Sequence, residues 1–93
     1  MADPPHVQTQ LTLTNKLGLH ARAAAVFVRA LTGLNAQVTV SWEGRSVNGR
    51  SVLELMTLGA PLGSILEIRV SGADAEAALA ALTTVVENRF YEE

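Results

Sequence analysis

The sequence predicts an α+β fold: a two-layer open-faced sandwich in which a four-stranded antiparallel sheet is covered on one face by three helices, in the order β-α-β-β-α-β-α. Three segments alternate between apolar and polar residues, which is typical of strands with one buried face. The segments between them carry apolar residues at helical spacing or a helix-capping signal. Because only one face of each strand is apolar, the pattern favours an antiparallel sheet with helices on one side and solvent on the other.

The domain organisation follows from the length. With 93 residues, 48% of them hydrophobic, the chain is long enough for one core and too short for two. We expect a single domain over residues 7–90. Residues 1–6, which include two prolines, are expected to form a flexible N-terminal tail, and residues 91–93 a C-terminal tail.

The first strand and helix lie in the N-terminal third. Residues 7–14 alternate and predict a strand. Residues 15–19 are predicted to form a loop, because Asn and Gly tolerate positive φ. Apolar side chains then recur every three or four residues, which predicts a helix over about 21–31 with Gly33 as its C-cap.

A hairpin is predicted next. Residues 36–42 alternate between apolar and polar side chains, as the first strand does. Glu43-Gly44 is a tight-turn signal, so residues 45–48 are expected to return as a short antiparallel partner.

The C-terminal half holds two more helices around one strand. Ser51 and Glu54 have the S-x-x-E form of a capping box, which predicts a short helix through about Leu58. Glycine and proline then interrupt the chain, and residues 65–71 alternate again, which predicts the last strand. Asp74 is expected to cap a final helix whose apolar stripe runs to Phe90.

Composition excludes several function classes. A net charge of −2 and only 4% aromatic residues argue against a nucleic-acid partner. The absence of cysteine excludes a disulfide scaffold and thiol chemistry and fits a reducing compartment. No apolar run reaches the roughly 18–20 residues that span a bilayer, and the first residues do not resemble a signal peptide, so we expect a cytoplasmic protein without direct membrane insertion. Two histidines without clustered carboxylates predict no metal site, and no cofactor is expected.

Charge is unevenly distributed along the chain. Residues 16–50 contain five basic side chains and one acidic one, whereas residues 51–93 contain two basic and seven acidic ones. If Arg22, Arg45 and Arg50 share one face with His20, an acidic partner would be steered to it. Association should then slow as salt rises, because screening at 0.15 M acts over about 8 Å.

His20 is the first candidate for chemistry. It falls at the predicted N-cap of the first helix, where Ser, Thr, Asp or Asn would be stronger caps. Unpaired N–H groups and the positive end of the helix dipole make this position an anion site, and they favour a neutral, nucleophilic imidazole. Arg22 can direct its planar guanidinium group at a phosphate bound there. A surface or capping histidine is the alternative, and local spacing alone leaves it open.

Ser51 is the second candidate. A phosphate at a helix N-terminus is electrostatically favourable, so Ser51 can be a phosphorylation site, although a role as a cap alone remains the alternative. The same surface is expected to carry an apolar patch rimmed by arginine, which is typical of a transient docking face. The docking residues predicted for it are Arg50, Val52, Leu55 and Met56.

At these two places the sequence resembles the histidine-containing phosphocarrier family, HPr, of the bacterial phosphoenolpyruvate-dependent phosphotransferase system. Residues 18–22, Gly-Leu-His-Ala-Arg, match the active-site signature, and residues 47–51 with 55–59 match the regulatory-serine region. The resemblance covers about residues 7–90. It implies the same open sandwich and a protein that is a substrate of phosphotransferases and not itself an enzyme.

The resemblance also implies roles for single residues. His20 would accept a phosphoryl group on Nδ1 from phosphorylated enzyme I, form a phosphohistidine and pass the group to sugar-specific IIA components, and Arg22 would assist the transfer. Ser51 would be the target of a regulatory serine kinase/phosphorylase. Ala23 stands where most members have proline, and it restores a backbone N–H at the anion-binding end. Glu54 also departs from the small or basic residue common there, which weakens the expectation that a kinase recognises Ser51.

Two further readings compete with the sugar phosphocarrier. One is a purely regulatory binding module that acts through the Ser51 face, and the other is a paralogue serving a nitrogen-regulation branch. Because a relay protein must expose His20, a monomer is expected.

Overall fold

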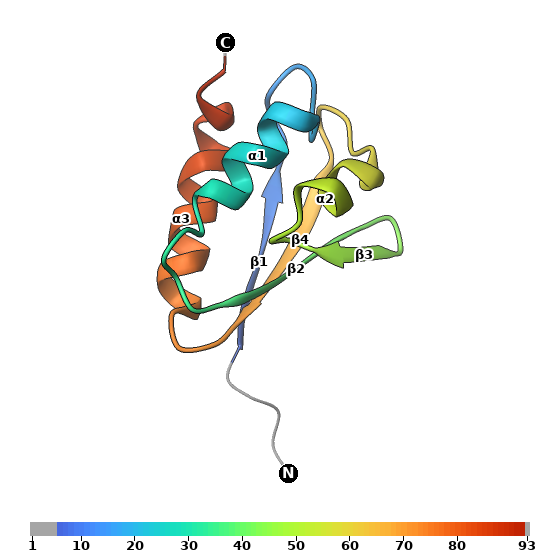
Figure 1. Ribbon diagram of the computed structural model, residues 1–93. Coiled ribbons are helices and arrows are strands. Elements are labelled where there is room, and N and C mark those ends of the chain that lie inside the picture. The colour runs from blue at the N-terminus through green and yellow to red at the C-terminus, as the bar shows by residue number, and fades with distance from the viewer. Residues whose placement is uncertain (1–5, 93) are drawn as a thin grey trace.

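Four strands in the order β1-β4-β2-β3 form one antiparallel sheet, and the three α-helices cover one of its faces (Figure 1). The structure is a computed structural model that describes residues 6–92. In chain order the elements are β1 (His6–Thr12), α1 (Ala21–Arg29), β2 (Gln37–Trp42), β3 (Arg45–Asn48), α2 (Val52–Leu58), β4 (Ile65–Ser71), α3 (Ala75–Glu87) and the 3-10 turn η1 (Arg89–Tyr91). The predicted fold class and element order are confirmed.

The alternating pattern of the strands places one face of the sheet in the core. In β4, which pairs with both β1 and β2, Leu66, Ile68 and Val70 are buried. Glu67 and Arg69 between them are exposed on the open face. Because side chains alternate across a strand, this register fixes which residues the helices contact.

The helices bury the residues that recur at helical spacing. Phe27 of α1 is fully buried, as are Leu55 of α2 and Leu82 of α3. α3 packs over β1 and β4, while α1 lies between α2 and α3. This packing holds the first turn of α1 and η1 at the same end of the molecule (Figure 1).

Several predicted boundaries differ by a few residues. β1 ends at Thr12 and not at Thr14, because Leu13 leaves the strand pairing and bonds through its backbone to Ser64 and Gly63. α1 ends at Arg29 with Ala30 as its C-cap, so the prediction of Gly33 as C-cap is wrong. Gly33 lies in the following turn with φ +80°.

Two predicted caps form different hydrogen bonds. Ser51 Oγ accepts from the backbone N–H of Glu54 at 3.1 Å, as expected, but the Glu54 carboxylate accepts from the N–H of Asn48 instead of closing the capping box on Ser51. Asp74 makes no side-chain cap bond to α3. Its Oδ2 accepts from the N–H of Asn35 at 2.7 Å and so ties the loop before β2 to the start of α3.

The folded region extends past both expected tail boundaries. His6 is the first residue of β1 and pairs with Ser71, while the rest of the expected N-terminal tail lies outside the described residues. At the other end Phe90 is buried, and residues 89–91 all have φ between 55° and 61°. Left-handed backbone costs about 1–2 kcal/mol for a non-glycine residue, and burial of Phe90 offsets part of that cost. The turn directs Glu92 back toward the start of α1, so residues 91 and 92 are part of the fold.

No helix among residues 6–92 is both long and apolar enough to cross a membrane.

Candidate functional site

His20 is the N-cap residue of α1, and its side chain does not cap the helix. Its backbone is extended, with φ −87° and ψ −176°, and its ring forms no bond to the N–H groups of the first turn. The first intrahelical bond runs from Ala24 N–H to His20 C=O at 2.8 Å. The preceding N–H groups of a helix have no intrahelical acceptor, so they remain directed at the space beside the imidazole.

The loop before His20 is held against residues 60 and 61. Leu19 N–H donates to Ala60 C=O at 2.9 Å, and Gly18 has φ +64°. A Cβ on Gly18 would lie 2.3 Å from the Ala60 carbonyl oxygen. The positive φ and the lack of room for a Cβ both require glycine at this position. The close approach of Gly18 to Ala60 also fixes the position of the backbone that leads into His20.

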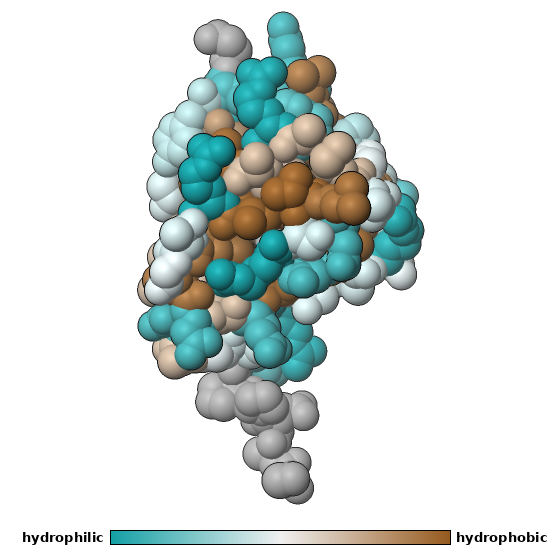
Figure 2. Space-filling model, viewed as in Figure 1, coloured by the Kyte–Doolittle hydropathy of each residue, from teal (hydrophilic) through white to brown (hydrophobic). Residues whose placement is uncertain are grey.

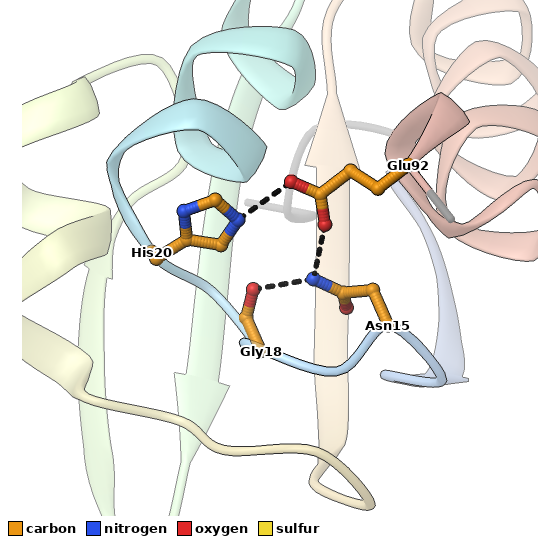
Figure 3. Close-up of polar contacts among 4 residues, drawn as sticks. All are labelled: Asn15, Gly18, His20 and Glu92. Carbon is orange, nitrogen blue, oxygen red and sulfur yellow. Dashed lines mark hydrogen bonds and ion pairs between the residues drawn. The ribbon is translucent and has the colours of Figure 1, made fainter.

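Glu92 contacts His20 directly. Its Oε2 lies 2.7 Å from His20 Nε2, and its Oε1 accepts from Asn15 Nδ2 at 3.0 Å (Figure 3). Asn15 is fully buried, and the same Nδ2 also donates to Gly18 C=O at 2.7 Å. The His20 side chain is 23% exposed and the Glu92 side chain is 14% exposed. The imidazole ring is therefore accessible to solvent, while the Glu92 carboxylate is largely covered. Sequence reasoning missed both Asn15 and Glu92 as site residues.

The pKa of Glu92 is lowered below its ordinary value. Burial acts to raise the pKa, but the hydrogen bonds from Asn15 and His20, together with the charges of His20 and Arg22, outweigh it. Glu92 is therefore ionised at neutral pH and presents two acceptor oxygens to its neighbours.

This shift predicts a pH dependence of stability. A carboxyl group with a lowered pKa in the folded state stabilises the fold above its unfolded pKa, and this contribution is lost as pH falls through the folded value. The free energy of unfolding of the wild type should therefore exceed that of Glu92→Gln at pH 7, and the difference should shrink below about pH 4.5. Thermal unfolding followed by circular dichroism from pH 3 to 7 measures it. Glu67→Gln, on the open face of the sheet, is the matched control, and a difference independent of pH would contradict the prediction.

Arg22 is exposed in the first turn of α1 and faces the same region as Glu92. Together with Lys16, Leu17 and Tyr91 these two residues line a shallow depression of about 450 Å³. The depression places two cationic side chains beside the site. Ala23, in the same turn, is fully buried, so alanine at this position contributes to the core. Among residues 6–92 no group of three histidine, aspartate or glutamate side chains is arranged to hold a metal ion.

The predicted docking residues separate into exposed and buried ones. Leu55 is fully buried, which corrects its assignment to the docking surface, because it lies on the face of α2 that packs against the sheet. Met56 is 41% exposed and Val52 is half-buried. Leu53, which sequence reasoning missed, is 73% exposed. Figure 2 shows the resulting apolar band over α2, and Ser51 lies half-buried at the start of this helix.

Arg50 is exposed, as expected of a docking residue, and its guanidinium is also bonded to backbone carbonyls. Its Nη1 donates to the carbonyls of Leu34 and Ala36 at 3.2 and 3.1 Å, and its Nη2 donates to Leu31 C=O at 3.4 Å. These carbonyls follow the C-terminal end of α1, roughly 15 Å along the helix from His20 at about 1.5 Å per residue. Arg50 therefore holds the segment between α1 and β2.

Arg45 is distant from His20 as well. It begins β3 next to the tight turn of the β2–β3 hairpin, which Figure 1 shows away from the start of α1. Of the three arginines whose common face was the condition for steering, Arg22 is the one that lines the depression beside Glu92. Only Arg22 lies beside the site, accompanied by Lys16.

The role of Arg50 can be measured. Arg50→Ala removes a charged donor from three carbonyls and should lower the free energy of unfolding by about 1–3 kcal/mol. Arg45→Ala is the control and should change it by less than about 0.5 kcal/mol, as is usual for an exposed surface residue. Urea unfolding measures both. Equal, small effects of the two substitutions would show that the Arg50 bonds do not stabilise the fold.

Comparisons with known proteins match nearly the whole chain. A family model described as the PTS HPr component phosphorylation site matches residues 7–88. The phosphocarrier protein HPr of Xylella fastidiosa (strain Temecula1) is 41% identical over 87 residues, which cover 94% of this chain and 98% of the relative. The crystal structure of HPr-C-His from Thermoanaerobacter tengcongensis has a TM-score of 0.88 at 34% identity and covers 94% of this chain and 98% of that one. A crystal structure of an HPr dimer from the same organism has a TM-score of 0.73 at 33% identity, covering 99% and 100%.

Proposed function

Since the chain belongs to the HPr family and is a phosphocarrier of the phosphotransferase system, we propose that His20 is the residue that carries the phosphoryl group. The observation that supports this most directly is the uncapped start of α1, where an accessible imidazole lies beside N–H groups without intrahelical acceptors. Phosphorylated enzyme I is the proposed donor, and IIA components are the proposed acceptors.

The chemistry fits these parts. The lone pair of Nδ1 forms a bond to phosphorus as the bond between phosphorus and the donor breaks, and the donor keeps that electron pair. The N–H groups at the start of α1 bind the phosphoryl oxygens, and Arg22, exposed in the same turn, supplies a positive charge. Because the product is a labile phosphorus–nitrogen bond, the group can move on to the next protein. No metal ion or cofactor takes part in this scheme.

Labelling of the wild-type protein tests the assignment. The protein is incubated with enzyme I and phosphoenolpyruvate carrying labelled phosphate, and the labelled peptide is then sequenced. The label should be acid-labile and base-stable and should lie on the peptide that contains His20. Label on the peptide containing His6, base-labile label on Ser51, or no label would each contradict the proposal.

A second proposal concerns Ser51. Ser51 is half-buried, and its Oγ already accepts a bond from the N–H of Glu54. Ser51 precedes the helix that carries exposed Leu53 and Met56. Phosphorylation by a serine kinase/phosphorylase would add about two negative charges next to this apolar band and alter docking of a partner. Arg50, Val52 and Met56 keep the docking role proposed for them, whereas Leu55 is buried in the core.

Paired variants separate capping from regulation at Ser51. Ser51→Ala removes the cap and should lower the free energy of unfolding by about 1 kcal/mol. Ser51→Asp keeps a cap and adds charge, so it should change binding to enzyme I or a IIA component with little loss of stability. Calorimetric titration measures the binding. Identical affinities for wild type and Ser51→Asp would argue against switching at this position.

Localisation and oligomeric state complete the proposal. A cytoplasmic monomer fits a relay in which two partners must each reach His20 in turn. Size-exclusion chromatography coupled to light scattering tests the monomer, and a dimer such as the one crystallised for the Thermoanaerobacter tengcongensis relative would contradict it.

A further inference from the structure

The carboxylate of Glu92 links residues that are far apart in the sequence into one chain of contacts. Figure 3 shows His20 Nε2 facing Glu92 Oε2, while Glu92 Oε1 faces Asn15 Nδ2, which also reaches Gly18 C=O. Both carboxylate oxygens are thus engaged, one by the imidazole and one by a fully buried amide. The partner of His20 is therefore held in place and does not merely approach it from solvent.

The orientation of the Asn15 amide is fixed by its neighbours. Both acceptors, Gly18 C=O and Glu92 Oε1, lie at Nδ2, whose two hydrogens can serve both. A flipped amide would place an oxygen against two other oxygens. The donor therefore faces the carboxylate, and Asn15 anchors Glu92.

The contact also determines which imidazole nitrogen carries hydrogen. An ionised carboxylate only accepts hydrogen bonds, and at 2.7 Å its Oε2 requires a donor on Nε2. In a neutral imidazole with hydrogen on Nε2, the free lone pair lies on Nδ1. Nδ1 is thereby left as the nucleophile.

We infer that Glu92 is a positioning residue for phosphoryl transfer: it holds His20 in the Nε2–H tautomer and, once Nδ1 is phosphorylated, stabilises the positive charge of the ring. This inference rests on the proposed role of His20. When Nδ1 bonds to phosphorus, the proton on Nε2 stays in place and the ring gains a positive charge that faces the Glu92 carboxylate. In onward transfer the bond from Nδ1 to phosphorus breaks, and the ring keeps the electron pair and leaves as neutral imidazole.

The charges around the ring oppose one another. Glu92, from the segment after η1, favours the protonated phosphorylated ring, while Arg22 of α1 and Lys16 of the preceding loop disfavour it. Tyr91 also borders the depression next to Glu92. Because Glu92 alone makes direct contact with Nε2 among residues 6–92, its removal should dominate the effect on transfer.

Nitrogen-15 NMR of the imidazole groups tests the tautomer without any partner protein. Wild type should show His20 with hydrogen on Nε2, with His6 as an internal reference at the start of β1. Glu92→Ala should show a mixture of tautomers, whereas Glu92→Gln should largely keep the Nε2–H form because an amide oxygen still accepts. Glu67→Gln is the matched control. The same tautomer in wild type and Glu92→Ala would overturn the inference.

Release of the phosphoryl group tests the charge. In purified phosphorylated protein, hydrolysis should begin to slow at a lower pH in Glu92→Gln than in wild type. Above that pH, hydrolysis in Glu92→Gln should be about tenfold slower than in wild type. A tenfold difference corresponds to about 1.4 kcal/mol of lost interaction between the carboxylate and the charged ring. Unchanged profiles in both Glu92 variants would exclude the charge effect. Absence of label on wild-type His20 would overturn the proposed function instead, so the two failures are distinguishable.

Discussion

Replacing His20 with alanine is expected to abolish incorporation of labelled phosphate from phosphoenolpyruvate and enzyme I. The substitution removes the only nucleophile placed at the uncapped start of α1 among the described residues, and neither Arg22 nor the N–H groups can take its place. His20 does not cap the helix, so α1 loses no cap bond and the circular dichroism spectrum should stay unchanged. The rate should fall to the background without protein, since a covalent carrier without its acceptor atom has no alternative route.

His6→Ala is the matched control for this experiment. His6 lies at the start of β1, exposed and close to Arg69 on the open sheet, so its loss should leave labelling at the wild-type rate. Undiminished labelling of His20→Ala would show that another residue carries the group. Loss of labelling in both variants would point to a general effect on the fold, which the spectra would reveal.

Replacing Gly18 with alanine is expected to impair both folding and transfer. Left-handed backbone at φ +64° strains an alanine, and its Cβ would lie 2.3 Å from the Ala60 carbonyl oxygen and 2.8 Å from Pro61 Cα. Strain and overpacking each cost about 1–3 kcal/mol. Because both close contacts are to backbone, the loop must move, and it would carry His20 away from Glu92. Urea unfolding measures the first effect, and the initial rate of labelling measures the second.

Gly59 offers a matched control for Gly18. It has nearly the same φ, +65°, but a Cβ there meets nothing within 4 Å. Gly59→Ala should therefore show only the cost of the conformation and should label normally. If the two variants lose equal stability, the close approach of Gly18 to Ala60 is not what positions the site.

The elements were predictable where one physical signal dominates. Strict alternation in residues 65–71 fixes which side of β4 is buried, and helical spacing identifies Phe27 as core. The same spacing also applies to α2, where residues three apart share a face. Leu55 and Leu58 are three apart and both buried, whereas Leu53 is off this spacing and exposed. His20 and Arg22 are candidates from the sequence because His20 is a weak residue for an N-cap and Arg22 can reach an anion bound at the start of the helix.

The contacts that complete the site lack such a local signal. Glu92 reaches His20 across 72 positions of sequence. The sequence predicts Asn15 to lie in a loop because Asn tolerates positive φ, and that rule says nothing of its bond to Glu92. Arg50 is exposed, as its position beside Ser51 predicts, but the sequence does not show that its guanidinium donates to three carbonyls. Each of these depends on how distant segments pack, which periodicity and capping rules do not encode.

The distance in sequence between His20 and Glu92 also sets an order of events during synthesis. Ribosomes add about 5–20 residues per second, so Glu92 is added roughly 4–14 s after His20. During that interval the nascent chain already contains the histidine but lacks the carboxylate that orients its ring. On the proposed role of Glu92, translation past this residue and docking of η1 are the steps that fix the tautomer of His20.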